Sequence, residues 1–342
     1  MTEPHVIDLA DPDAVESLAP DWRELAWHRP GTSYFQSPEW AAAWWQHLAG
    51  QPETKVAVWR GPGGKLEAVA AMSRRTERLH RKVAVPVTFW TNTGSGPGAA
   101  DHMGFPAIDK RHPDVAAWVA ALGGSVLLRN LAPAAHSLIP SEAEPIDDSI
   151  CPRLAIPSGD EPVGRSTKYR KRLQRNSRIL REKGIEFRPV AGPDITPGML
   201  DRLMQLHEAR SDAQGWGTTF TPERIGFHRQ LIESSSERHG PGMMIAETPD
   251  EVVGILYGFW WQDSFSYFQT GWDPSWWELS LGTALVHEMI LHARAQGATL
   301  FDFLRGPEEY KYRFGAEDQI DQTWLLARGA SGKVLQAKAR VG

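Results

Sequence analysis

The sequence predicts an α/β protein with two units of one kind, each a mixed, mostly antiparallel central sheet flanked by helices. Three observations support this. The chain has 342 residues, more than a single hydrophobic core usually serves. The same order of helix and strand patterns occurs in both halves. Between them, Pro133–Gly164 contains six prolines and little apolar periodicity. We therefore expect a first domain over 1–132, a linker over 133–164 and a second domain over 165–342.

The first half contains the pattern in a faint form. Two helical patterns precede three strand patterns, and a further helix and strand follow. In chain order, these segments are Ala14–Ala26, Pro38–Leu48, Lys55–Arg60, Leu66–Ser73, Val83–Trp90, Pro113–Leu122 and Ser125–Asn130.

The second half begins with a well-marked helix. Ser166 or Thr167 can cap a helix that runs to about Lys183, and Gly184 ends it. A strand at Ile185–Val190 and a helix at Met199–Arg210 follow. Thr221-Pro222 places an N-cap before a proline at the first helical position, so a second helix runs from there to about Gly240.

Alternating strands and a long helix complete the second half. The segments are three strands at Met243–Glu247, Val252–Trp261 and Ser264–Trp272, a helix at Leu281–Gln296, and short strands at Thr299–Leu304 and Gln322–Arg328. The order is β-α-α-β-β-β-α-β-(α)-β, the same mixed unit as in the first half.

Composition restricts the kind of protein. Cys151 is the only cysteine, which excludes an internal disulfide and a cysteine-based zinc site, and we expect no metal. No apolar run reaches the roughly 18 residues that span a bilayer, and the acidic first residues do not resemble a secretory signal. We expect a soluble, cytoplasmic protein.

One segment is strongly basic although the whole chain has a net charge of −5. Arg165–Lys183 has nine basic residues and one acidic residue, which leaves almost no ion pairing along the helix. An anionic partner is favoured over a solvated charged surface, and we expect Arg170, Lys171 and Arg175 to bind it. The partner is CoA phosphate, an anionic acceptor or a tRNA backbone.

A second anion site is expected where the last helix of the unit begins. The small residues of Ser280-Leu281-Gly282-Thr283-Ala284 expose backbone N–H groups at the positive end of a helix, a setting that suits pyrophosphate. The alternative is an ordinary helix start with Ser280 as N-cap and Gly282 for close packing.

The element order and three stretches resemble the GNAT acyltransferases, in particular double-GNAT proteins of the CelD-like (BioF2-like) acetyltransferase family. Fem-type aminoacyl transferases are more distantly similar. The stretches are Phe35–Trp40 with Trp44-Trp45, the basic helix Ser166–Gly184, and Ser280–Leu285 with Phe301–Gly306 and Tyr310–Gly315. The resemblance implies tandem GNAT-like domains, with catalysis in the second.

The resemblance also implies a donor and a reaction. It implies an acyl-CoA such as acetyl-CoA, bound with its pyrophosphate at Ser280–Ala284, and direct attack by an amine or hydroxyl of a small acceptor. The first position of the pyrophosphate motif is Leu279 rather than Arg or Gln. An aminoacyl-tRNA donor of Fem type therefore stays open, as does a non-catalytic scaffold that binds a ligand.

Four residues are candidates for chemistry. By the resemblance, Tyr310 protonates the leaving group and Lys311 stabilises the tetrahedral intermediate. Asp302 interrupts an apolar strand, so it either acts directly or pairs with Arg305 or Arg313. His207, in a His-x-x-Arg pattern with Arg210, is either the base or a core histidine. Further substrate contacts are expected from Arg210, Trp216, Tyr267, Gln269, Trp272 and Arg305.

Overall fold

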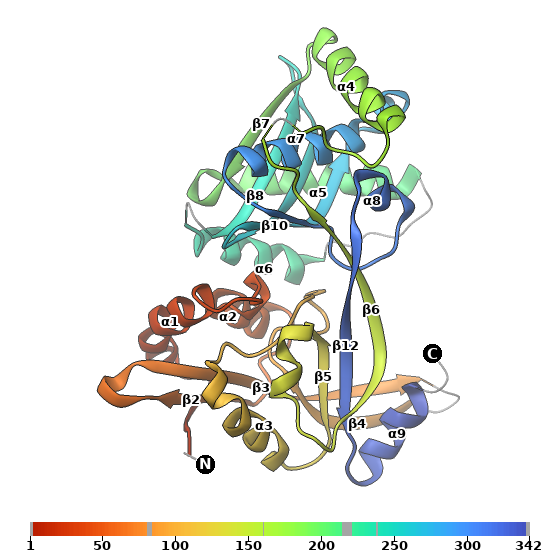
Figure 1. Cartoon of the computed structure of the whole chain (residues 1–342). Helices are drawn as coiled ribbons and strands as arrows, with labels where there is room; N and C mark the ends of the chain where they lie inside the picture. The colour runs from red at the N-terminus through yellow and green to blue at the C-terminus, as the bar shows by residue number, and fades with distance from the viewer. Residues whose placement is uncertain (1–2, 81–83, 160, 214–220, 237–238, 340–342) are drawn as a thin grey trace. The chain divides into compact units, whose positions relative to one another are not determined.

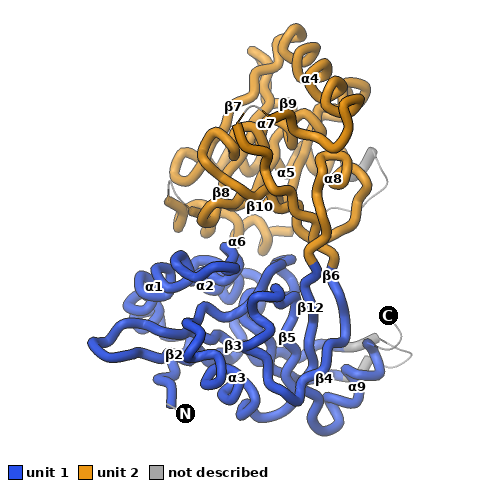
Figure 2. Tube along the Cα trace, viewed as in Figure 1, with its two compact units in different colours: residues 1–149, 320–342 blue, residues 150–319 orange. Residues whose placement is uncertain are grey.

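The computed structural model describes residues 3–80, 84–159, 161–213, 221–236 and 239–339. The chain forms two compact units (Figure 2). Unit 1 consists of residues 1–149 and 320–342, and unit 2 of residues 150–319. Each unit has a mixed sheet with helices packed on it (Figure 1). Among the described residues, no helix combines the length and the apolar character needed to cross a bilayer.

Unit 1 has the strand order β1-β2-β3-β4-β5-β12, antiparallel except for the β4–β5 pair. Its helices start at sequence-coded caps: Asp11 accepts from the Ala14 N–H, and Ser37 from the Trp40 N–H, each before a proline. Its elements are β1 (His5–Ile7), α1 (Pro12–Trp27), α2 (Pro38–His47), β2 (Thr54–Arg60), β3 (Leu66–His80), β4 (Ala84–Asn92), α3 (His112–Ala121), β5 (Val126–Leu131), β12 (Glu317–Leu326) and α9 (Gly329–Ala339).

Unit 2 has the strand order β6-β11-β10-β9-β8-β7, and here the parallel pair is β10–β11. The predicted strands at Val252–Trp261 and Ser264–Trp272 are confirmed at their boundaries, as is the N-cap Ser166. Its elements are β6 (Glu144–Ala155), α4 (Thr167–Glu182), β7 (Glu186–Ala191), α5 (Pro197–Ala213), α6 (Pro222–Glu233), β8 (Gly240–Glu247), β9 (Val252–Trp261), β10 (Ser264–Trp272), α7 (Leu281–Ala295), β11 (Leu300–Asp302) and α8 (Glu309–Phe314).

The two units divide the chain differently from the predicted boundaries. The segment expected as a linker, 133–164, contains β6, whose end pairs with β11 of unit 2. The end of the chain, expected in the second domain, returns to unit 1, where β12 pairs with β5. Strands β6 and β12 each cross a unit boundary: residues 144–149 of β6 and 320–326 of β12 belong to unit 1, and the remaining residues of both strands belong to unit 2. Local patterns predict that a strand forms but not its partner, because strand pairing is non-local.

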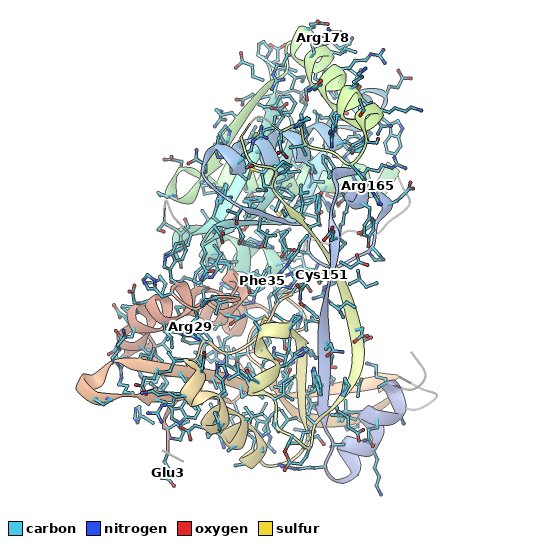
Figure 3. All side chains as sticks on the ribbon, in the orientation of Figure 1. Glu3, Arg29, Phe35, Cys151, Arg165 and Arg178 are labelled. Carbon is cyan, nitrogen blue, oxygen red and sulfur yellow. The ribbon has the colours of Figure 1, made fainter. Side chains whose placement is uncertain are left out.

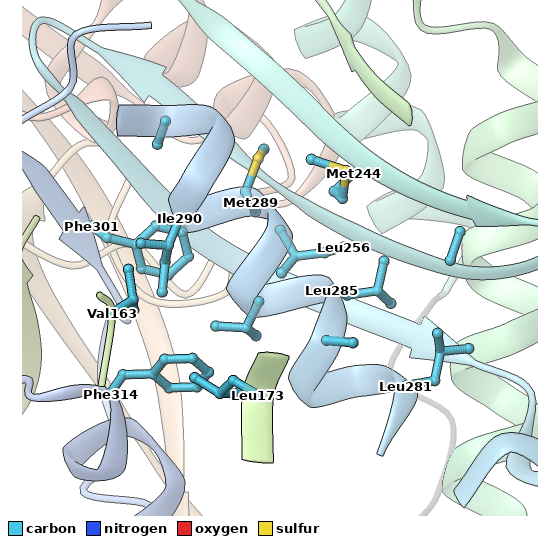
Figure 4. Packing of buried hydrophobic residues seen from close by; sticks show 14 of the residues in the cluster. Val163, Leu173, Met244, Leu256, Leu281, Leu285, Met289, Ile290, Phe301 and Phe314 are labelled. Carbon is cyan, nitrogen blue, oxygen red and sulfur yellow. The ribbon is translucent and has the colours of Figure 1, made fainter. Parts of the chain in front are cut away.

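The core of unit 2 is organised by α7 (Figure 4). Leu281, Leu285 and Met289 recur every four residues on one face of this helix and are almost fully buried. Leu173 of α4 and Phe314 of α8 belong to the same apolar cluster. Helices α4, α7 and α8 are thus held by one core, which fixes the side chains that these helices present to solvent.

Truncating Leu285 to alanine is expected to destabilise the protein by about 2–5 kcal/mol, because it removes a fully buried side chain and leaves a cavity. Urea unfolding followed by circular dichroism measures the loss. Leu291→Ala is the matched control, since that side chain is only partly buried, and its cost should be clearly smaller. Equal costs for the two variants would contradict this description of the core.

Candidate active site

A cavity of about 350 Å³ lies in unit 2 where four segments meet. They are the end of α5, strand β10, the turn into α7, and α8. Its lining combines one cation, several hydroxyl groups and four large aromatic rings. The lining residues are Arg210, Tyr267, Thr270, Trp272, Trp277, Ser280, Gly282, Thr283, Val286 and Tyr310. Seven of these are predicted site residues, drawn from segments distant in sequence.

A β-bulge in β10 shapes the wall of this cavity. Tyr267 pairs with Gly258 and Gln269 with Tyr257, so Phe268 has no partner in the register. In a regular strand Tyr267 would face away from Thr270. The extra residue changes this alternation and places Tyr267 in the lining with Thr270 and Trp272.

The turn into α7 presents an uncapped helix start to the cavity. Ser280 occupies the N-cap with left-handed backbone angles (φ 53°), and its side chain makes no capping hydrogen bond. The first turn has no acidic residue. The N–H groups of Thr283 and Ala284 reach only the Ser280 carbonyl. The helix start therefore offers an anion the positive end of the helix dipole with no side chain in competition.

Gly282 allows α7 to approach β10. A Cβ atom at this position would lie 2.6 Å from the Trp272 Nε1, far inside van der Waals contact. The Trp272 ring is in turn packed on Trp277, with ring centroids 5.6 Å apart. Gly282 and the two tryptophans thus form one wall of the cavity. Leu281 and Ala284 are buried in the core and do not line the cavity.

Gly282→Ala is expected to cost about 1–3 kcal/mol of stability, because the added methyl overpacks against Trp272. The displaced indole should also weaken ligand binding in the cavity. Thermal unfolding and donor titration measure the two effects. Gly198→Ala is the control: its Cβ would meet nothing closer than 3.9 Å, so that variant should be neutral or slightly more stable. Identical behaviour of the two variants would contradict the proposed contact.

Two tyrosine hydroxyls are hydrogen-bonded inside the cavity. Burial raises the pKa of Tyr267 to about 12 and, as the largest of several causes, raises the pKa of Tyr310 well above its usual value. The hydrogen bond between the two hydroxyls also contributes, raising the pKa of Tyr310 and lowering that of Tyr267. The positive charge of Arg210 lowers the pKa of both. Both hydroxyls therefore keep their protons at neutral pH.

Lys311 has a different environment from its neighbour Tyr310. Its side chain is 3% exposed, and its Nζ donates to the carbonyls of Leu304, Arg305 and Gly306 at 2.8–3.1 Å. The Glu308 carboxylate lies 2.8 Å away. These acceptors use all the donors of the ammonium group. Lys311 does not line the cavity, and its contacts make it a clamp on the loop 304–306.

Asp302 is buried in an ion pair. Its Oδ2 accepts from the Arg153 Nε at 2.7 Å, and its Oδ1 accepts from the Leu304 N–H at 2.8 Å. Arg153 stands opposite Asp302 in the β6–β11 register. The carboxylate thus pairs across the sheet with β6, whereas the sequence suggested Arg305 or Arg313. Arg313 instead pairs with Glu309.

His207 and Arg210 both contact the backbone of β10. The His207 Nδ1 lies 3.2 Å from the Thr270 carbonyl, and the Arg210 guanidinium donates to the same oxygen at 3.3 Å. Burial lowers the pKa of His207, so it is neutral at pH 7. Only Arg210 lines the cavity. His207 has the position of a packing residue between α5 and β10.

The other predicted contacts lie away from the cavity. Gln269 accepts from the Thr270 N–H, and Arg305 is exposed on the loop before α8. On α4, Lys171 and Arg175 are exposed, and Arg170 donates to the Gly164 carbonyl. Trp216 lies outside the described residues.

Three lining residues were not predicted: Thr270, Trp277 and Val286. Trp277 could have been predicted in part from the sequence. It belongs to a Trp-Trp pair just before a helix start, and its side chain is 61% exposed. An aromatic ring so exposed beside an anion site is typical of a ligand contact.

Comparisons with known proteins bear on the domain family and the fold. Residues 167–312 match the family model of the acetyltransferase (GNAT) domain. No curated protein matches the sequence. The fold is similar to FemX, at 9% identity over 94% of this chain and 98% of that one, with a TM-score of 0.66.

Two other solved structures share the fold over nearly their whole lengths. One is the C-terminal domain of a putative lysylphosphatidylglycerol synthetase from Agrobacterium fabrum, at 10% identity over 95% of this chain and 96% of that one, with a TM-score of 0.59. The other is L-PGS from Bacillus licheniformis, at 10% identity over 99% and 97%, with a TM-score of 0.55. At these identities the likeness concerns the fold. Residues 167–312 form a GNAT-type acyltransferase domain.

Proposed function

We propose that unit 2 transfers an acyl group from acyl-CoA to an amine or hydroxyl of a small acceptor in the cavity between β10, α7 and α8. One observation carries the proposal: the uncapped start of α7 and the protonated Tyr310 line the same cavity. An acyl donor with a phosphate group needs both, one to hold the phosphate and one to meet the leaving group.

In the proposed reaction, the donor pyrophosphate binds at Ser280–Thr283 and Trp277 packs against the donor. The acyl carbonyl lies beside the bulge in β10. The acceptor nucleophile attacks the carbonyl carbon, the bond to the leaving sulfur breaks, and Tyr310 donates a hydrogen bond to the departing thiolate. The proton that the nucleophile loses passes to solvent water. Because the pKa of Tyr310 is raised, it stabilises a thiolate by hydrogen bonding more readily than by full proton transfer.

We propose direct attack without a covalent enzyme intermediate. Among the described lining residues there is no cysteine. The lining residues also include no carboxylate, so we propose that an amine acceptor enters as the free base. Arg210, the cation of the cavity, is then the contact for an anionic group on the acceptor.

The second candidate is transfer from an aminoacyl-tRNA. Leu279 stands where the resemblance expects Arg or Gln, which weakens the case for CoA, and the basic helix α4 favours a polyanion. A leaving ribose hydroxyl is more basic than a thiol, so it matches the raised pKa of Tyr310 better. A third reading, a scaffold that binds without catalysis, predicts that Tyr310 can be replaced without functional loss.

The donor is tested by thermal-shift titration with acetyl-CoA, longer acyl-CoAs, free CoA and charged tRNA. A ligand at 100 times its Kd adds about 2.7 kcal/mol to the stability of the folded state. A saturable shift with acyl-CoA that weakens in Gly282→Ala supports the proposal. A shift with charged tRNA alone transfers support to the second candidate, and no shift with any donor contradicts both.

A further inference from the structure

A second pocket, of about 710 Å³, lies on the other side of α8 from the proposed active site. Helix α8 lines both: Tyr310 points to the first, and Glu309, Tyr312 and Arg313 to the second. The opposite wall comes from the start of α4 and consists of Arg165, Ser166, Lys168, Tyr169 and Arg172. Figure 3 labels Arg165 at this end of the helix and Arg178 near its other end.

The pocket is strongly basic. Its lining has four cations and a single carboxylate, that of Glu309, which pairs with Arg313 at 2.7 Å. Arg165, Lys168 and Arg172 make no ion pair with any residue that the structure describes. In the second half of α4 the pattern is different: Arg178 faces Glu182 at 3.5 Å, and Arg181 bonds Glu288 at 2.7 Å.

This arrangement is unfavourable without a ligand. The N-terminal end of a helix carries the positive end of the dipole, so acidic residues stabilise it and basic ones destabilise it. The first turn of α4 has no acidic residue, and Arg165, Lys168 and Arg172 surround it. A sequence that breaks a local rule without compensation in the fold indicates a functional site. A bound anion would supply the negative charge that is missing at the start of α4.

A buried hydroxyl gives a second, independent indication. Tyr169 lines the pocket, its side chain is 8% exposed, and its hydroxyl has no hydrogen-bond partner among the residues that the structure describes. An unpartnered buried hydroxyl costs free energy unless a ligand or water meets it. The Arg172 guanidinium lies 5.3 Å from the centre of the Tyr169 ring, so a hydroxyl donor and a cation occur together.

We propose that this pocket binds a phosphate-bearing ligand with at least two negative charges, at a site separate from the acyl-transfer cavity. Lys168 and Arg172 are four residues apart in α4, about 6 Å along the helix axis, and Arg165 precedes the N-cap Ser166. These three cations together suit two or more phosphates. Such a ligand is a small organic polyphosphate or a run of RNA phosphates. The site does not depend on which acyl donor the enzyme uses.

The full-length protein is titrated with inorganic pyrophosphate and with a short single-stranded RNA, each at several salt concentrations. In Lys168→Ala/Arg172→Ala, affinity for the bound probe should fall about 10- to 100-fold, since charge-assisted hydrogen bonds are lost. The salt dependence should decrease by about two ion equivalents. Arg178→Ala is the control, a paired cation of the same helix outside the pocket, and its affinity should stay within twofold.

The outcomes separate the possible sources of phosphate. Saturable pyrophosphate binding that exceeds RNA binding assigns the site to a small polyphosphate, and tighter RNA binding with a steeper salt dependence assigns it to an RNA backbone. The proposal is overturned if neither probe binds. It is also overturned if binding is retained in the double variant and lost in Gly282→Ala, which would locate the anion at α7.

The same variants distinguish this proposal from the acyl-transfer proposal. Lys168→Ala/Arg172→Ala should keep its acyl-CoA thermal shift while it loses pyrophosphate or RNA binding. Its folding is checked by thermal unfolding, and relief of charge repulsion should leave its Tm equal to or above that of the wild type. A double variant with a lowered Tm and unchanged probe affinity would make these cations structural.

Discussion

Tyr310→Phe is expected to lower kcat by about 100- to 1000-fold, the range in which a positioned proton donor contributes to catalysis. The hydroxyl lines the cavity and holds its proton, because burial raises its pKa well above the usual value. Phenylalanine preserves the ring, which packs on Phe303 at a centroid distance of 6.1 Å. The loss should therefore appear in kcat and leave thermal stability nearly unchanged.

Tyr312→Phe is the matched control for this experiment. It removes a hydroxyl from the same short helix, one that bonds Asp318 at 2.7 Å outside the active cavity. Its kcat should stay within about twofold, as for a surface substitution away from the site. A loss of less than threefold in Tyr310→Phe would contradict the proposed role and favour a binding scaffold.

The pH dependence gives a further check on Tyr310. A group whose folded pKa is raised keeps its proton over the whole range below that pKa. Because the pKa of Tyr310 is raised above 10, its deprotonation should not reduce kcat at any pH up to 9. The ratio of wild-type to Tyr310→Phe rates should stay constant from pH 6 to 9. A ratio that falls toward one as pH rises to 9 would mean that the hydroxyl ionises in this range.

The fold was predicted from local sequence patterns. Caps such as Ser166 and Thr221-Pro222 and the alternation in β9 and β10 depend on neighbours in sequence, and these elements start where they were expected. Helix α6, however, ends at Glu233 and not near Gly240. The pairing of β6 with β11 and of β12 with β5 could not be predicted, because a strand pattern does not encode its pairing partner. For the same reason the bulge in β10 was missed, and with it the reason why Tyr267 joins Thr270 in the lining.

The lining of the cavity was predicted where it depends on the backbone alone. The helix start at Ser280–Thr283 is such a case, since exposed N–H groups and small residues are visible in sequence. The directions of adjacent side chains were harder to predict. Tyr310 and Lys311 were predicted to act together, but consecutive residues on a helix point about 100° apart. Tyr310 reaches the cavity, and Lys311 reaches the loop 304–306.

Lys311→Met is expected to destabilise the protein by about 2–4 kcal/mol, because it leaves buried carbonyl groups without a donor. The Leu304 and Gly306 backbones have positive φ angles of 56° and 107°, so the loop depends on this clamp to stay in an otherwise unfavourable conformation. The cost stays below that of a fully buried ion pair, since the partner Glu308 is 57% exposed and can be solvated. Denaturant unfolding measures it, with the exposed Lys333→Met as control.

Kinetic measurements then distinguish a structural role of Lys311, as a clamp on the loop 304–306, from a direct role in catalysis. Measured well below the Tm of the variant and corrected for the folded fraction, kcat of Lys311→Met should fall less than that of Tyr310→Phe, because the lysine reaches Tyr310 only through the loop and α8. Wild-type stability together with a kcat loss of more than about 100-fold would be the signature of a group that stabilises the transition state itself. That result would support the predicted role of Lys311, stabilisation of the tetrahedral intermediate. Its ammonium group would then have to break its hydrogen bonds to the three carbonyls during turnover.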